Sequence, residues 1–158
     1  GSEMCIRDSN QALIEGAVGG IVATDCKIGR SRYWAANATV PVNEISFRIV
    51  MTNVSSKPVT LSGDNFATTL DGTPIPPFNF SARDVGDADI WRTYDSLTIR
   101  PGEERSVALA YEISQPTYDS WYRSSRTVAV SFTCGNQRVT YTKNSRSDEI
   151  TVSDIETL

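Results

Sequence analysis

Apolar and polar residues alternate along most of this chain. The clearest run is residues 43–53, where Ile45, Phe47, Ile49 and Met51 occupy every second position. Side chains on a strand point alternately to its two faces, so this spacing predicts a strand with one buried face and one solvated face.

Shorter alternating runs share this period and are separated by turn signals such as Asp71-Gly72 and Pro101-Gly102. They predict further strands at residues 20–27, 59–61, 66–70, 97–99, 105–113, 127–134 and 138–142. Residues 73–80 contain three prolines and are expected to form an edge strand or a loop. Residues 30–40, 82–94 and 114–126 are expected to be loops, and no long stretch has helical spacing.

The strand and turn motifs resemble those of secreted immunoglobulin-like domains in bacterial and archaeal lipoproteins and cell-surface proteins. They are a strand that ends at Asn53, the run Pro58-Val-Thr-Leu61, the Asp71-Gly72 hairpin and the Pro101-Gly-Glu103 turn. The resemblance covers about residues 20–141 and implies an all-β, immunoglobulin-like antiparallel β-sandwich of about seven or eight strands. The family is one of unknown function and offers no catalytic residues to carry over.

The chain is expected to divide into four parts. Residues 1–9 read as a tag and an artefactual leader, because Gly1-Ser2 looks like a cloning scar and residues 4–9 resemble a translated sequencing adapter. Residues 10–19 are a lead-in or linker, residues 20–143 the sandwich, and residues 144–158 a polar tail or final edge strand. The expected location is extracellular or at the cell surface, with membrane anchoring through a missing N-terminal segment as a further expectation.

The composition argues against enzyme chemistry. The chain has no histidine, so it lacks the commonest general base and cannot contain a Ser-His-Asp triad or a Cys-His catalytic pair. Its net charge is -4, so the chain lacks the excess of basic residues that is typical of nucleic-acid-binding proteins. We therefore expect no catalytic residues, no nucleic-acid partner and no cofactor, with Ca²⁺ as the one ion to consider.

Two cysteines are candidates for a disulfide. Cys5 falls in the artefactual leader, which leaves Cys26 and Cys134 near the ends of an early and a late strand. An extracellular setting favours a bond between them, whereas the alternative is two buried free thiols.

Aromatic residues gather in the predicted loops and supply the candidate ligand-binding set. All three tryptophans lie there, and the set is Trp34, Trp91, Tyr94, Trp121 and Tyr122. Exposed rings of this kind stack on sugars or anchor protein interfaces, but the same rings could instead fold back to cap the open ends of the sandwich.

An acidic loop supplies the candidate metal site. Asp84, Asp87 and Asp89 place three carboxylates close together, and oxygen ligands suit Ca²⁺. The spacing is not that of an EF-hand, so a solvated acidic loop is the alternative.

Together these patterns predict a non-catalytic extracellular accessory, adhesion or interaction domain of a prokaryotic cell-surface protein or filament. Its expected partner is a protein or glycan at the cell surface, and self-association through an edge strand or the tail is a further expectation. The alternative function is a carbohydrate-binding module that uses the loop Trp and Tyr residues.

Overall fold

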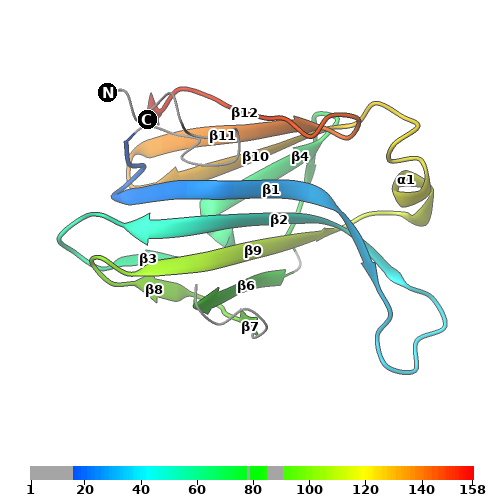
Figure 1. Cartoon of the computed structure of the whole chain (residues 1–158), viewed down its shortest axis with the longest axis horizontal. Coiled ribbons are helices and arrows are strands. Elements are labelled where there is room, and N and C mark those ends of the chain that lie inside the picture. The colour runs from blue at the N-terminus through cyan, green and yellow to red at the C-terminus, as the bar shows by residue number, and fades with distance from the viewer. Residues whose placement is uncertain (1–15, 78, 85–90) are drawn as a thin grey trace.

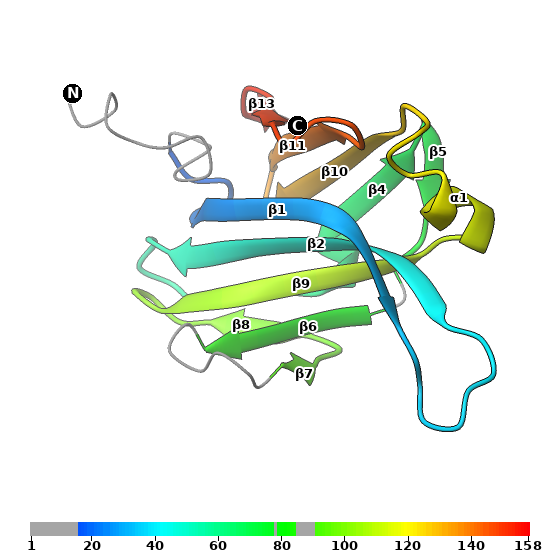
Figure 2. The same ribbon diagram turned by 45° about the vertical axis from the view of Figure 1, so that its right-hand side comes forward.

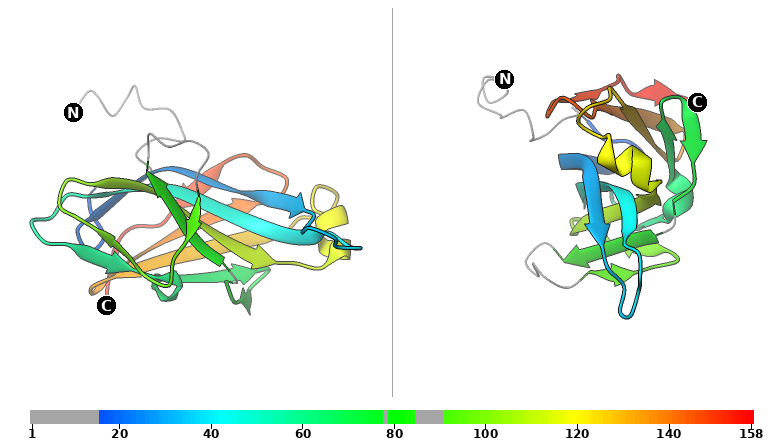
Figure 3. Two further views of the ribbon diagram at one scale, coloured as in Figure 1. Left: turned by 90° about the horizontal axis from the view of Figure 1, so that it is seen from below. Right: turned by 90° about the vertical axis from the view of Figure 1, so that its right-hand side faces the viewer.

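The computed structural model describes residues 16–77, 79–84 and 91–158, which form two antiparallel sheets packed face to face (Figures 1 and 3). The first sheet comprises, in spatial order, β1 (Ile21–Tyr33), β2 (Val42–Asn53), β9 (Glu104–Glu112), β6 (Asn79–Asp84) and β7 (Arg92–Thr93). The second comprises β12 (Ile150–Val152), β11 (Gln137–Asn144), β10 (Thr127–Cys134), β4 (Phe66–Leu70) and β5 (Thr73–Ile75). β13 (Glu156–Thr157) also pairs with β11. A third, two-stranded sheet is formed by β3 (Val59–Leu61) and β8 (Leu97–Ile99).

The strand order is that of an immunoglobulin-like sandwich. β1, β2, β9 and β6 occupy the places of strands A, B, E and D, while β4, β10 and β11 occupy those of C, F and G. β5 lies beside β4 in the place of an additional C′ strand. The predicted all-β sandwich is therefore confirmed.

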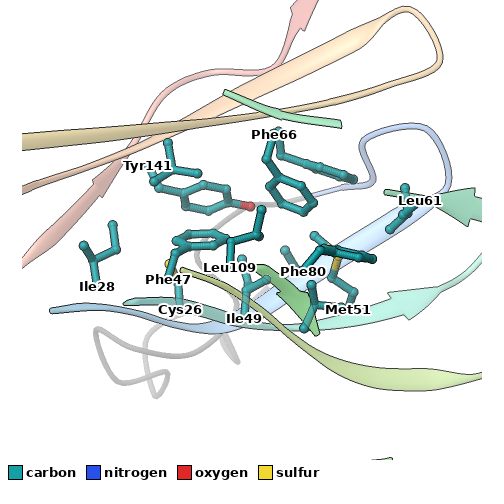
Figure 4. Packing of buried hydrophobic residues seen from close by; sticks show 14 of the residues in the cluster. Cys26, Ile28, Phe47, Ile49, Met51, Leu61, Phe66, Phe80, Leu109 and Tyr141 are labelled. Carbon is teal, nitrogen blue, oxygen red and sulfur yellow. The ribbon is translucent and has the colours of Figure 1, made fainter. Parts of the chain in front are cut away.

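The core forms where the inward faces of the two sheets meet (Figure 4). Ile45, Phe47, Ile49 and Met51 of β2 are all buried, as their alternation predicted. The Phe47 ring lies 5.8 Å from the Tyr141 ring of the opposite sheet, measured between centroids. Tilted aromatic pairs of this kind add to the stabilisation that burial gives.

The described residues contain thirteen strands, more than the seven or eight expected. One additional strand, β6, has six residues and runs from the proline-containing segment into the expected loop 82–94. The other four, β5, β7, β12 and β13, are two or three residues long, which is too short for alternation to reveal them. The C-terminal tail is one such case, because its β12 and β13 both pair with β11. Of the two expectations for residues 144–158, the final edge strand is the one that the structure shows.

All three regions that were expected to be loops contain regular structure. Residues 82–94 include the end of β6 and the whole of β7. β1 continues through residues 28–33, because the ladder with β2 extends to the pair Tyr33 and Val42. The 114–126 segment contains the short helix α1 (Gln115–Asp119), which Ser114 caps by accepting a hydrogen bond from the backbone N of Thr117. A 3₁₀ turn spans Gly63–Asn65. Among the described residues, no helix is long and apolar enough to cross a membrane.

The two ends of the sandwich differ. At one end the backbone N of Gly19 donates to Gln137 Oε1 at 2.9 Å, and that of Leu158 donates to Asn136 O at 2.7 Å. Residues 19 and 158 therefore both lie beside the β10–β11 turn. The loop between β1 and β2 projects from the opposite end, near α1 (Figure 2).

Candidate functional site

The projecting loop between β1 and β2 is the most exposed apolar feature of the described residues. We call residues 33–43 the tip; none of them is charged. Three large side chains of the tip are open to solvent, with Tyr33 45% exposed, Trp34 61% and Val40 67%. Apolar groups clustered at one projecting point mark a contact surface more often than single scattered ones do.

A cation–π stack holds the base of the tip. The Arg30 guanidinium lies 4.2 Å from the ring centroid of Tyr118 and 4.6 Å from that of Tyr122, and Arg32 lies 4.1 Å from Tyr118. Arg32 also forms an ion pair with Asp119 at 3.3 Å. These contacts join β1 to the segment around α1 and fix the direction in which the hairpin leaves the sandwich.

The position of the two arginines explains this arrangement. Arg30 and Arg32 follow Ile28 at every second position, so they occupy the inward face of β1. Ile28 is buried, whereas the arginines lie on the rings of the α1 segment. The change from apolar to charged on one face of β1 is a sequence signal that the strand is leaving the core, and the sequence prediction missed it.

The predicted aromatic set does not form one site. Trp121 is only 1% exposed and packs in the core near the α1 end, so it caps the sandwich and cannot serve as an exposed stacking platform. Trp34 and Tyr122 are each 61% exposed, at the tip and at its base. Tyr94 is half-buried against the core, and its hydroxyl accepts a hydrogen bond from Arg105 at 3.3 Å.

Trp91 marks a second surface, on the outer face of the first sheet. Its ring lies 5.4 Å from the Arg48 guanidinium and 5.1 Å from that of Arg83. A shallow hollow of about 110 Å³ lies beside it. The hollow is lined mainly by small and polar side chains, which are Glu44, Ser46, Arg48, Asn79, Ser81, Ala108 and Ala110 with Leu109 and Trp91.

The calcium hypothesis concerns residues that the structure leaves largely undescribed. Asp87 and Asp89 lie outside the described residues, and Asp84 is described only as the last residue of β6. Within the described ranges, no group of three or more Cys, Asp or Glu residues is placed to hold a metal ion. The Ca²⁺ site therefore stays a prediction from the sequence.

The predicted disulfide is corrected: Cys26 and Cys134 are both buried free thiols. Cys134 lies at the end of β10, with its Sγ 3.7 Å from the carbonyl O of Gly19. Cys26 lies further along β1, in the core beside Phe47 (Figure 4). The prediction placed both cysteines near the ends of their strands, but the end of β10 lies beside Gly19, at the start of β1. Because Cys26 lies further along β1, the two thiols are separated by roughly 15 Å of strand.

Burial makes both thiols poor nucleophiles. It raises the pKa of Cys26 strongly, and the nearby Asp25 carboxylate raises it further. Burial also raises the pKa of Cys134, while a backbone hydrogen bond from Gly135 opposes the shift. Because the thiolate is the reactive form, neither cysteine is arranged for chemistry at neutral pH.

No family model matches the chain, and no curated protein sequence matches it. Its fold is similar to that of ycdA from Bacillus subtilis, a candidate lipoprotein, with a TM-score of 0.52 and 10% identity over 87% of this chain and 39% of that chain. An uncharacterized β-sandwich protein from Clostridium difficile matches with a TM-score of 0.50 and 15% identity over 87% of this chain and 95% of that one. The chain thus spans well under half the length of ycdA, and both likenesses support a β-sandwich domain without assigning it a role.

Proposed function

We propose that this chain is a non-catalytic interaction module of a prokaryotic cell-surface protein or filament, and that it binds its partner through the tip. The observation that carries the proposal is the exposure of Tyr33, Trp34 and Val40 on a projecting tip that has no charged residues. Aromatic residues supply much of the binding energy at protein interfaces, so exposing them at the end of a supported hairpin favours a binding role.

The shape of the domain supports this proposal. Residues 19 and 158 lie beside the β10–β11 turn, and the tip projects from the other end (Figure 2). A domain attached to its neighbours through either of these residues would present the tip outward. The cation–π stack of Arg30 and Arg32 supports the hairpin, which reduces the entropy lost when the tip binds.

The test is binding of the fluorescently labelled domain to isolated bacterial envelope fragments. We expect saturable binding that excess unlabelled domain displaces, and a loss of at least about tenfold in affinity for the double variant Tyr33→Ser, Trp34→Ser. Val54→Ser is the matched control, since Val54 is 59% exposed just beyond β2 at the opposite end of the sandwich. Absence of saturable binding, or equal binding by the double variant, would refute the proposal.

The second surface supports an alternative function, binding of a glycan. Trp91 stands beside a shallow hollow whose lining carries the hydroxyls of Ser46 and Ser81 and the amide of Asn79. An aromatic ring beside hydrogen-bonding groups is an arrangement that can receive a sugar ring. A glycan panel read by intrinsic fluorescence tests it: Trp91→Ala should abolish a response that Trp34→Phe leaves intact, and a panel without any response would reject the alternative.

A further inference from the structure

We infer that the partner of the tip is the interfacial region of a lipid bilayer, into which Trp34 and Tyr33 insert. This inference rests on the proposed function and names the class of partner that it leaves open. It depends on three observations: the shape of the tip, the kind of side chains it exposes, and the cations behind it.

The tip has the shape of a finger, and every residue from 33 to 40 is exposed. Protein interfaces gain most of their affinity where side chains enter well-packed pockets. A finger whose residues are all open to solvent presents no pocket of its own, and a bilayer requires none, because lipids rearrange around an inserted side chain. The convex shape therefore suits a fluid partner, which needs no pocket to receive it.

The exposed side chains are those that prefer the membrane interface. Trp34 and Tyr33 are amphipathic aromatics, which concentrate at the level of the lipid headgroups, and Val40 adds an aliphatic group. No charged side chain lies between Arg32 and Glu44, so the tip can enter the interface without burying a charge. The uncharged segment ends on both sides at a charged residue, which limits the depth of insertion.

One cation, Arg32, lies behind the tip at the depth of the lipid phosphate groups. Arg32 precedes Trp34 by two residues, which places it about 7 Å further from the end of an extended strand. Amphipathic segments sink about 5–10 Å into the interface, so the two depths agree. Arg32 is paired with Asp119. Arg30 has no carboxylate partner among the described residues, but it lies about 13 Å behind Trp34, stacked on the Tyr118 and Tyr122 rings, so it attracts anionic lipid only from behind the insertion depth. Glu44 lies nearby, where it accepts a hydrogen bond from Ser31, and it limits the preference for anionic lipid.

Vesicles of phosphatidylcholine and phosphatidylglycerol, with and without brominated phosphatidylcholine, test the inference. In the Trp91→Phe variant the remaining tryptophans are Trp34 and the buried Trp121, so brominated lipid should quench the fluorescence of Trp34. When Trp34→Phe is added to the Trp91→Phe variant, the tip keeps an aromatic ring. The protein should then still co-sediment with vesicles, but brominated lipid should no longer quench its fluorescence.

The binding measurement uses the same matched pair of variants as the envelope assay. The double variant Tyr33→Ser, Trp34→Ser should lose at least about tenfold in vesicle partitioning, and Val54→Ser should partition like the wild type. Quenching that persists without Trp34, or the absence of partitioning, overturns the inference. If vesicles fail while envelope binding still depends on the tip, the partner is a protein or glycan and only the bilayer inference is lost; if both assays fail, the proposed function is lost as well.

Discussion

Asn53 should contribute more to stability than any other polar side chain at the end of the sandwich opposite the tip. It is fully buried at the end of β2. Its Nδ2 donates to the carbonyl oxygens of Lys57 and Ile99, both at 2.8 Å, while its Oδ1 accepts from the backbone N of Ser55 at 2.9 Å and from Ser55 Oγ at 2.7 Å. One side chain thus joins β2, the following turn and β8.

The substitution Asn53→Ala removes all four of these hydrogen bonds. A typical bond of this kind contributes about 1 kcal/mol net, and a buried group left without a partner costs about 1–3 kcal/mol. Ser55 is partly exposed and can bond to water, and the carbonyl of Lys57 keeps its bond from Ser55 Oγ, so the main loss falls on the buried carbonyl of Ile99. We therefore expect the unfolding free energy to fall by about 3 kcal/mol.

Urea unfolding followed by tryptophan fluorescence measures this loss. With a denaturant dependence of about 2 kcal/mol per M, typical of a small domain, the midpoint should fall by about 1.5 M. Asn53→Asp is the sharper variant, because it keeps the acceptor oxygen but places a carboxylate against the carbonyls of Lys57 and Ile99. It should be less stable than Asn53→Ala at neutral pH and recover in acid, where the protonated group can donate again. A loss under about 1 kcal/mol for Asn53→Ala, or a wild-type stability for Asn53→Asp, would refute this reasoning.

Tyr118→Ala removes the ring on which Arg30 stacks at 4.2 Å, so the unfolding free energy should fall by about 1 kcal/mol and hydrogen exchange in residues 30–33 should accelerate; unchanged exchange would mean that the β-ladder alone holds the hairpin. Cys26 and Cys134 have raised thiol pKa values because they are buried, so both should resist a thiol reagent at neutral pH until the protein unfolds, and a non-reducing mass showing a bond between them would contradict the structure. The pKa of Glu103 is lowered from 4.5, mainly by a hydrogen bond from a backbone N–H, so the stability it contributes is present above that pH and is lost as the pH falls through the folded-state value. Glu103→Gln should flatten this part of the curve of stability against pH, and an unchanged curve would reject the assignment.

The sequence predicted those parts of the fold in which a single local constraint, such as side-chain alternation or a turn conformation, determines the structure. The alternation of β2 indicates a sheet with one buried face, and its four apolar inward residues are all buried. Asp71-Gly72 forms the predicted hairpin with φ of 52° and 83°, a conformation that these residue types tolerate. Asp71 Oδ1 also accepts from the backbone N of Thr127 at 2.8 Å, which ties this turn to the start of β10.

The failures have a different origin, because they depend on how far a strand extends and on which strand ends meet. Neither alternation nor turn signals showed that β1 continues to Tyr33. The disulfide prediction failed because the end of β10 meets the start of β1, beside Gly19, and not the part of β1 that holds Cys26. The prediction that Trp121 is an exposed ligand-binding residue was also wrong. A Trp in a polar segment carries no sequence signal that separates an exposed ring from one that closes the core. Tertiary packing decides whether such a side chain is buried or exposed.

The same reasoning explains why the tip can expose apolar residues without loss of the fold. Inward positions of β1 are apolar as far as Ile28, where the opposite sheet still covers them, and become arginine at Arg30 and Arg32, where the α1 segment takes its place. Between Arg32 and Asn43 the chain contributes no residue to the hydrophobic core, so core packing does not select Tyr33 and Trp34. Two exposed aromatic side chains at such a position lower solubility and do not stabilise the fold. We therefore expect that they contact another surface.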